Sequence, residues 1–112
     1  MSECIFCRIV QGEISADKKY EDEEFLAFTD INPQAPFHYL IIPKKHVSNL
    51  MEIQDEDMVG RLFSVIRHLA KEEKLDEKGF RVVNNCGEEG GQTVDHIHFH
   101  LLGGRFMNWP PG

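Results

Sequence analysis

The chain has 112 residues, of which 28% are charged, and a formal net charge of −7 at pH 7. This length fits one ordinary domain, over residues 1–112, and excludes a barrel of about 250 residues. The acidic balance argues against binding to a nucleic-acid polymer, which needs a basic surface, but allows a small nucleotide. No apolar run approaches the roughly 20 residues that span a membrane, and no secretory signal is visible. We therefore expect a cytoplasmic protein with no membrane partner.

The first half of the chain predicts a short helix followed by two strands. Residues 5–11 form the helix, which Gly12 ends. Residues 24–28 and 37–42 are aromatic and β-branched runs typical of strands. A loop with two prolines, residues 30–36, joins them. The apolar side of the helix consists of Ile5, Phe6, Ile9 and Val10.

The second half begins with the strongest helix prediction, from Asp55 to about Lys74. Its apolar residues recur at helical spacing, and its acidic start and basic end suit the helix dipole. Residues 80–83 then predict a strand, and a glycine-rich loop over 88–93 leads into the last strand. Strands, one long helix and strands again, without repeated strand–helix–strand units, favour an α+β domain on an antiparallel sheet.

Three histidines, His96, His98 and His100, alternate with apolar residues in that last segment. Period-two alternation predicts a half-buried strand with the imidazoles on one face. A histidine pKa of about 6.5 suits a nucleophile, base or acid near neutrality. Three uses stay open: zinc binding, nucleophilic attack on phosphorus, or solvent exposure without a task. The core-facing residues would be Ile97, Phe99 and Leu101.

The loop before the histidines favours a phosphate ligand. Gly90 and Gly91 allow backbone N–H groups to approach an anion closely, and Thr93 adds a hydroxyl donor. A glycine-rich loop alone is weak support, because most such loops are turns. Its position next to three histidines strengthens the prediction of a phosphate site.

Several segments together resemble one known family. Residues 92–102 contain His-x-His-x-His followed by two apolar residues, and further matches lie at 30–38, 42–46, 83–84 and 103–112, which ends in Trp-Pro-Pro-Gly. They resemble the histidine triad (HIT) family, and its nucleotide-binding branch in particular. The resemblance implies a HIT-like α+β fold with five antiparallel strands, one long helix and one short helix. It also implies a homodimer that extends the sheet, with the tail 103–112 at the edge shared by dimer and active site.

The resemblance implies a hydrolase that cleaves purine nucleoside 5′-phosphoramidates or similar nucleoside monophosphate conjugates. His98 would attack the α-phosphorus and carry a covalent nucleotidyl intermediate, which water would then release. His100 would contact the phosphate and help move a proton, and His96 would orient His98. This chemistry would need no cofactor.

The same resemblance assigns the nucleotide site. Asp30 would bind the ribose hydroxyls, His38 would be a fourth histidine near the triad, and Trp109 would shape the leaving-group pocket of the partner. For the apolar members of the base pocket, packing without any ligand remains an alternative. The base pocket would consist of Ile5, Phe6, Ile9, Phe28 and Ile31. The phosphate side would consist of Asn84, Gly91, Gln92, Thr93 and Val94.

Cys4 and Cys7 have the Cys-x-x-Cys spacing with which two thiolates bind one zinc ion. A redox pair would require a preceding strand and a βαβ context, which the pattern does not show. The resemblance to some bacterial members adds His46 and His96 as ligands of a structural Zn²⁺. Such a site would fasten the short N-terminal helix to the sheet.

Three other functions stay open. A dinucleoside polyphosphate hydrolase would use the same triad, and a nucleotide-binding regulatory module would hydrolyse only incidentally. A zinc hydrolase would use His96 and His98 as metal ligands, so its activity would depend on the metal.

Overall fold

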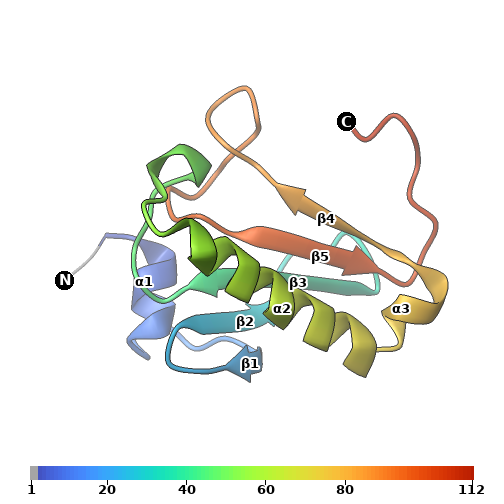
Figure 1. The fold of residues 1–112 in the computed structure, drawn as a ribbon, viewed down its shortest axis with the longest axis horizontal. Helices are drawn as coiled ribbons and strands as arrows, with labels where there is room; N and C mark the ends of the chain where they lie inside the picture. The colour runs from blue at the N-terminus through green and yellow to red at the C-terminus, as the bar shows by residue number, and fades with distance from the viewer. Residues whose placement is uncertain (1–2) are drawn as a thin grey trace.

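A computed structural model describes residues 3–112; Met1 and Ser2, part of the predicted domain, lie outside the described residues. Five antiparallel strands form one sheet in the order β1-β2-β3-β5-β4, which confirms the predicted fold class. Figure 1 shows α2 running across one face of this sheet. The elements are α1 (Ile5–Val10), β1 (Lys18–Glu21), β2 (Phe25–Thr29), β3 (Phe37–Pro43), the 3-10 helix η1 (Leu50–Glu52), α2 (Glu56–Glu72), α3 (Leu75–Lys78), β4 (Phe80–Asn84) and β5 (Phe99–Gly103).

The main core lies between α2 and the sheet. Leu62, Ile66 and Leu69, on the predicted apolar face of the helix, are almost completely buried. Each such side chain contributes roughly 1.5–3 kcal/mol when it leaves water. Alternate residues of the strands complete this core: Phe25, Ala27, Tyr39, Ile41, Phe99 and Leu101.

A smaller apolar cluster covers part of the opposite face, where α1 packs. Phe6 and Ile9 are the buried residues of this helix. The remaining alternate residues of β2 and β3 face them, so both strands are buried on both sides, which explains their continuous apolar sequences. The cluster consists of Phe6, Ile9, Leu26, Phe28, Leu40 and Ile42.

Apart from one-residue shifts at element ends, the structure differs from the sequence prediction in three places. The long helix ends at Glu72, because Lys74 adopts a left-handed conformation with φ 60° before the single turn of α3. The edge strand β1 is mostly exposed and polar, so its pattern shows no strand signal. The last strand begins only at Phe99: the N–H of Ile97 donates to the carbonyl of Val47, outside the sheet ladder.

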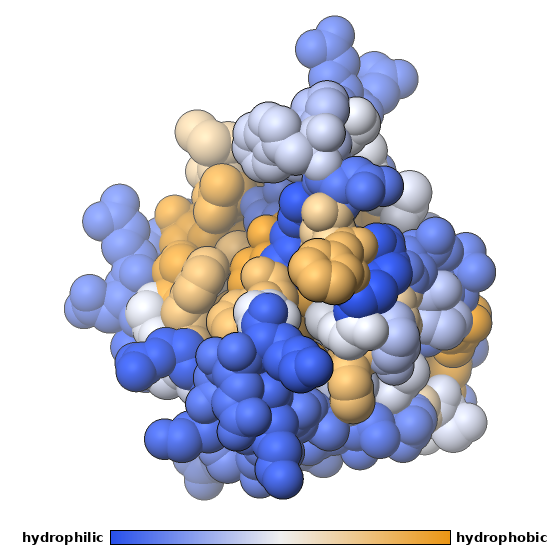
Figure 2. Space-filling model, turned by 90° about the vertical axis from the view of Figure 1, so that its right-hand side faces the viewer, coloured by the Kyte–Doolittle hydropathy of each residue, from blue (hydrophilic) through white to orange (hydrophobic). Residues whose placement is uncertain are grey.

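The surface carries several exposed apolar side chains near the C-terminal segment. Figure 2 shows apolar side chains gathered on the face that carries this segment and the beginning of β4. Phe80 at the start of β4 is 41% exposed, and Phe106 and Trp109 in the tail are 99% and 81% exposed. Among residues 3–112, no helix is both long and apolar enough to cross a membrane.

Candidate active site and metal centre

His98 lies in the extended segment just before β5, on the α1 side of the sheet, and only 4% of its surface is exposed. Its Nδ1–H donates to the main-chain carbonyl of His96 at 2.7 Å, so Nε2 keeps the lone pair. The Phe6 ring meets the imidazole edge-on, with centroids 5.1 Å apart. The Nδ2 of Asn84 donates to the His98 carbonyl at 2.9 Å. The His98 imidazole is thus oriented by its hydrogen bond to the His96 carbonyl and by the perpendicular contact with Phe6, and the His98 backbone is held by Asn84.

The predicted arrangement of the triad needs two corrections. Only His100 belongs to β5, whereas His96 and His98 precede the strand. The imidazoles of His96 and His98 are also buried rather than on a solvated face. The reason is α1, which covers this side of the sheet and places Phe6 edge-on against both rings.

A chain of hydrogen bonds joins β3 to the last triad histidine. The backbone N–H of Gln34 donates to Nδ1 of His38 at 3.0 Å, which leaves the proton of that neutral ring on Nε2. This Nε2–H then donates to Nδ1 of His100 at 2.9 Å. His100 therefore carries its own proton on Nε2. Asp30 lies beside the chain, with its Oδ2 3.4 Å from Nε2 of His38.

This chain consists of neutral rings at neutral pH. Burial is the main cause that lowers the pKa of His100 to about 4; the neighbouring His98 and His38 also contribute, and the charge of Asp30 opposes them. Burial also lowers the pKa of His38, again opposed by Asp30. His100 is thus a neutral hydrogen-bond donor in this arrangement.

Asp30, His38 and His100 also bring three potential metal-ligand atoms within 4.8 Å of one another. The N–H of Gln34 argues against a metal there. Because it requires an acceptor at Nδ1 of His38, the proton of the neutral ring occupies Nε2, the atom that a metal would need. The three residues therefore form a hydrogen-bond chain.

The glycine-rich loop closes on itself. The N–H of Gly91 donates to the carbonyl of Glu88 at 3.0 Å, so it does not face a phosphate. Gly90 is required by sterics, because a Cβ at this position would lie 2.3 Å from the carbonyl oxygen of Cys86. These glycines thus serve the turn itself. Thr93 lies exposed at the end of the loop.

Gln92 acts as a clamp for this loop. Its Oε1 accepts from the N–H of Gly87 at 2.9 Å. Its Nε2 donates to the carbonyls of Ser48 and Val94 at 2.7 Å and 2.9 Å. The amide that the resemblance assigns to the phosphate side is therefore engaged in holding the segment before the histidines.

Asn84 offers one open acceptor. Its Nδ2 is engaged by the carbonyl of His98, which fixes the orientation of the amide. Its Oδ1 is buried and has no hydrogen-bond partner among residues 3–112. An unsatisfied buried acceptor costs about 1–3 kcal/mol, so this atom favours a ligand donor beside the nucleophile.

The structure brings together only part of the predicted base pocket. Phe6, Ile9 and Phe28 are buried together in the cluster under α1. Ile5 is largely exposed, and Ile31 is 99% exposed, so neither encloses a pocket within the described chain. The predicted Trp109 also points to solvent. The predicted pocket residues that the structure brings together are therefore Phe6, Ile9 and Phe28, which pack on one another between α1 and β2.

Four predicted metal ligands converge at the start of α1. The Nδ1 of His96 lies 3.3 Å from the Sγ of Cys4 and 3.5 Å from the Sγ of Cys7. The Nδ1 of His46 lies 3.3 Å from the Sγ of Cys7 and 3.2 Å from the Nδ1 of His96. Zinc bonds of about 2.3 Å to sulfur and about 2.0–2.1 Å to nitrogen place tetrahedral ligands roughly 3.3–3.8 Å apart. The donor set fits zinc.

The surroundings of His96 also suit a metal ligand. Its Nε2–H donates to the carbonyl of Pro43 at 2.8 Å, which directs Nδ1 to the sulfurs. Burial lowers its pKa to about 4, so the ring is neutral, the form that binds metal. Because both cysteines and both histidines converge, the set has no open position, which argues against a catalytic zinc held by His96 and His98.

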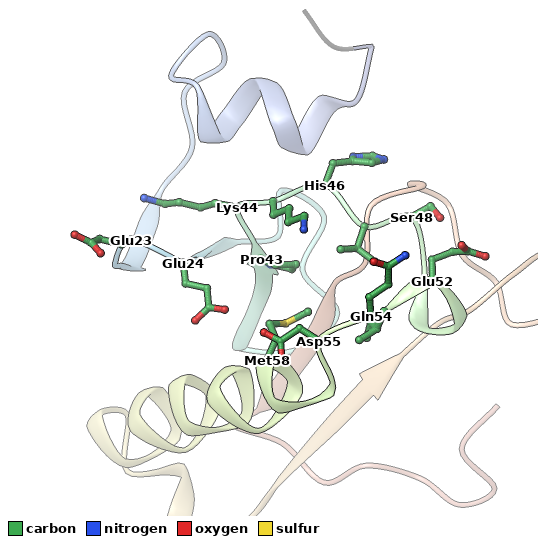
Figure 3. A pocket seen from close by; sticks show the side chains of 13 residues that line it. Glu23, Glu24, Pro43, Lys44, His46, Ser48, Glu52, Gln54, Asp55 and Met58 are labelled. Carbon is green, nitrogen blue, oxygen red and sulfur yellow. The ribbon is translucent and has the colours of Figure 1, made fainter.

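A hollow lies apart from the triad, between the end of β3 and the start of α2. Its volume is about 830 Å³, and its lining mixes acidic and basic side chains. Figure 3 shows Lys44 and Glu23 on one side, Glu52 and Gln54 on the other, and His46 turned away towards α1. None of the triad histidines is among the described residues that line it. The hollow thus adjoins the metal centre but not the nucleophile.

The HIT domain family model matches residues 11–107, a range that includes the triad. This chain belongs to the HIT domain family. The metal-ligand pair Cys4 and Cys7 precedes the matched range.

HIT proteins of known structure and plant relatives are similar along almost the whole chain. A HIT family hydrolase from Legionella pneumophila is 51% identical, with a TM-score of 0.95 and coverage of 98% of this chain and 100% of that chain. A histidine triad nucleotide-binding protein from Candida albicans is 40% identical, with a TM-score of 0.85 and coverage of 96% and 83%. A 14 kDa zinc-binding protein from Brassica juncea is 49% identical over 96% of this chain and 98% of its own length.

Two contributors to the site have no sequence signal. The N–H of Gln34 and the carbonyl of Pro43 set the protonated nitrogens of His38 and His96. Both are main-chain groups. Every residue has a carbonyl acceptor, and every residue except proline has an N–H donor. Only their placement in the fold identifies them.

Proposed function

We propose that this HIT protein is a nucleotide-binding hydrolase that cleaves purine nucleoside 5′-phosphoramidates, or similar nucleoside monophosphate conjugates, through a nucleotidyl-His98 intermediate. The observation that carries the proposal is the 2.7 Å hydrogen bond from Nδ1–H of His98 to the His96 carbonyl. It leaves Nε2 with a lone pair and no proton to remove. A nucleophile of this kind can attack phosphorus directly.

The attack forms a bond between Nε2 of His98 and the α-phosphorus, and the bond from phosphorus to the leaving amine breaks. The amine departs with the electron pair and takes up a proton from His100. Water then attacks the phosphorus, the bond from phosphorus to Nε2 breaks, and the nucleoside monophosphate leaves. The proton that water loses returns to His100, so both imidazoles regain their first state. Because these steps leave the protein little other covalent chemistry to perform, positioning of the reactants and stabilisation of charge supply most of the catalysis.

His100 is proposed to bind the phosphate with its Nε2–H, which the bond from His38 leaves available. Its pKa of about 4 keeps it neutral until a phosphate lies beside it. A nearby negative charge favours the imidazolium and raises that pKa. His100 can therefore carry a proton only when the substrate phosphate is bound, and its ring stays uncharged in the free enzyme.

Asp30 is proposed to accept hydrogen bonds from the ribose hydroxyls. Its Oδ1 accepts the backbone N–H of Asn32 at 2.8 Å, which holds the carboxylate in place. Phe6, Ile9 and Phe28 supply the apolar wall for the base. Thr93 and the backbone near Val94 supply donors for the phosphate side, and Oδ1 of Asn84 supplies an acceptor for a ligand N–H or O–H next to it.

The cofactor in this proposal is a structural Zn²⁺ held by the four donors at the start of α1. When bound, the zinc ion would cross-link α1 to the sheet and would take no part in the reaction as a Lewis acid. His96 thus holds the metal through its side chain and the nucleophile through its carbonyl.

Trapping of the intermediate tests the proposal. Acid-quenched reactions with a labelled adenosine phosphoramidate should give one nucleotide on His98, located by peptide mass spectrometry. His98→Gly should lower turnover by at least about 10³-fold with an unchanged circular dichroism spectrum. His68→Ala is the matched control, since His68 is an exposed histidine on α2.

Absence of nucleotide on the His98 ring, or near-normal turnover by His98→Gly, would reject the nucleophile. Faster cleavage of diadenosine polyphosphates than of phosphoramidates would favour the dinucleoside polyphosphate hydrolase. Tight binding of nucleoside monophosphates with negligible turnover of both classes would favour a regulatory module.

A homodimer is proposed to complete the leaving-group side of this site. β4 is an edge strand, and Phe80 at its start pairs with Gly103, where the tail begins. Phe80, Phe106 and Trp109 are exposed, and Figure 2 shows apolar side chains gathered on this face. Arg81 donates to the carbonyl of Asn108 at 2.9 Å, so the tail backbone is anchored while Trp109 projects outward. A second copy of this chain would cover these rings and extend the sheet.

Sedimentation velocity checks the dimer. The protein should sediment as two chains, and Phe80→Lys should shift it towards one chain at micromolar concentration. Met51→Lys, at an exposed apolar residue on η1, is the control and should leave the dimer intact. A monomeric parent protein would remove this part of the proposal.

A further inference from the structure

The metal centre and the nucleotide site share one six-residue helix. Cys4 caps α1 and Cys7 lies within it, so the two candidate ligands flank Phe6. The ring of Phe6 lies edge-on to His98, with centroids 5.1 Å apart, and to Phe28, with centroids 5.5 Å apart. The residue that contacts both the nucleophile and the base wall is therefore held between two metal ligands.

Apart from the candidate metal ligands, α1 is held mainly by apolar contacts, to which the partly buried Val10 also contributes. Only Phe6 and Ile9 of the helix are buried. Arg8 forms an ion pair with Glu13 at 3.3 Å, but both side chains are nearly half exposed, and such pairs contribute little. Isolated helices shorter than about 12 residues are marginal in water. The position of Phe6 thus depends strongly on what Cys4 and Cys7 bind.

A second connection passes through His96. Its Nδ1 faces the sulfurs, its Nε2–H donates to the carbonyl of Pro43, and its own carbonyl accepts from His98. The donor set and the nucleophile are therefore joined once through a ring contact and once through a main-chain hydrogen bond. The Phe6 contact acts on the His98 imidazole and on Phe28 of the base wall, whereas the His96 hydrogen bond acts on the imidazole.

The ribose and phosphate groups of the site depend on other elements. Asp30 follows β2, His38 belongs to β3 and His100 to β5, and their hydrogen-bond chain includes no atom of α1. If α1 moved from its position, the hydrogen bonds among Asp30, His38 and His100 would stay in place. The metal centre should thus affect recognition of the base more than recognition of the sugar phosphate.

We propose that occupation of the Cys4, Cys7, His46 and His96 site by zinc and binding of a purine nucleoside monophosphate are cooperative, with Phe6 as the positioning residue that couples them. This inference rests on the proposed function, because it assigns the base to the wall of Phe6 and Phe28. Thermodynamic linkage requires the same factor in both directions. We expect a factor of about ten, within the usual range of such couplings.

Two titrations of the whole protein test the coupling. Calorimetry measures the affinity for adenosine monophosphate and for ribose 5-phosphate, in zinc-loaded and chelator-depleted protein. Competition with a chromophoric chelator measures the zinc affinity with and without saturating adenosine monophosphate. Depletion should weaken adenosine monophosphate about tenfold and leave ribose 5-phosphate within about twofold. Adenosine monophosphate should strengthen zinc binding by the same factor of about ten.

Three variants locate the coupling. Cys7→Ser should weaken zinc binding and reproduce the depleted protein, whereas Cys86→Ser, outside the donor set, should match the parent protein. Phe6→Leu keeps all four ligands but removes the aromatic contact with His98. It should weaken adenosine monophosphate in loaded protein and abolish the dependence on zinc.

The outcomes are distinguishable. Equal affinity for adenosine monophosphate with and without zinc would overturn the inference and leave the proposed function intact. Equal loss of both ligands on depletion would also overturn it, since the metal would then only maintain the fold. Loaded protein that binds no adenosine monophosphate would reject the proposed function itself.

Discussion

The two faces of the sheet are held by different means. The face under α2 is covered by a 17-residue helix and a continuous apolar core. The other face is covered by the six-residue α1, a small apolar cluster and four candidate metal-ligand side chains. The proposed nucleophile, His98, lies on this second face. The side with the larger apolar core thus carries the scaffold, and the side with the smaller apolar cluster carries the candidate site.

The difference follows from residue types. Burial of a long amphipathic helix supplies stability through apolar area alone. Histidines on a covered face require hydrogen-bond partners, because an unpaired polar group in the interior is costly. His96, His98 and His38 each receive such a partner, from Pro43, from the His96 carbonyl and from Gln34. These hydrogen bonds also fix the orientations of the three imidazole rings on which the proposed catalysis depends.

Matched core substitutions give the largest expected effect. Leu62→Ala, under α2, should lower the free energy of unfolding by about 3 kcal/mol, with the same loss when a chelator is present. Ile9→Ala, on α1, should cost about 2–3 kcal/mol in zinc-loaded protein and much less in depleted protein. In depleted protein α1 is already loosened, so its burial contributes less. Urea denaturation with and without chelator measures both.

Equal costs of Ile9→Ala in the two conditions would show that apolar contacts alone hold α1. A chelator-dependent cost of Leu62→Ala would show that the two faces do not act independently. Either result would break the comparison between the faces.

The pH dependence gives a smaller effect. The pKa of His100 is lowered to about 4, so between about pH 6.5 and pH 4 the unfolded chain binds a proton that the folded chain does not. The free energy of unfolding should therefore fall as the pH falls through this window, by up to about 1.4 kcal/mol per pH unit for this group. The stability is retained above pH 6.5.

His100→Gln should reduce the slope of the unfolding free energy against pH by up to the contribution of one bound proton. His68→Gln, on the exposed face of α2, should leave that slope unchanged. Denaturant titrations of zinc-loaded protein at several pH values measure the slopes. Equal slopes for His100→Gln and the parent protein would mean that the ring protonates in the folded state as easily as in the unfolded chain.

Local sequence pattern was sufficient for much of the scaffold. The periodicity of residues 55–74 located α2 and its buried face, and the two apolar runs located β2 and β3. It was not sufficient for β1, whose residues are mostly polar because the strand lies at an exposed edge. It also extended the last strand too far, because alternation persists through His96 and His98 while the ladder begins only at Phe99.

By itself the sequence determined the chemistry present: three alternating histidines, a Cys-x-x-Cys pair and an acidic chain without a basic surface. The tertiary structure alone decided which nitrogen of each ring is protonated, that Gln92 clamps a loop, and that Cys4 and Cys7 meet His46 and His96. Those outcomes depend on main-chain groups and on residues up to 92 positions apart. Residue identity specifies what a side chain can donate or accept, but only folding selects its partner.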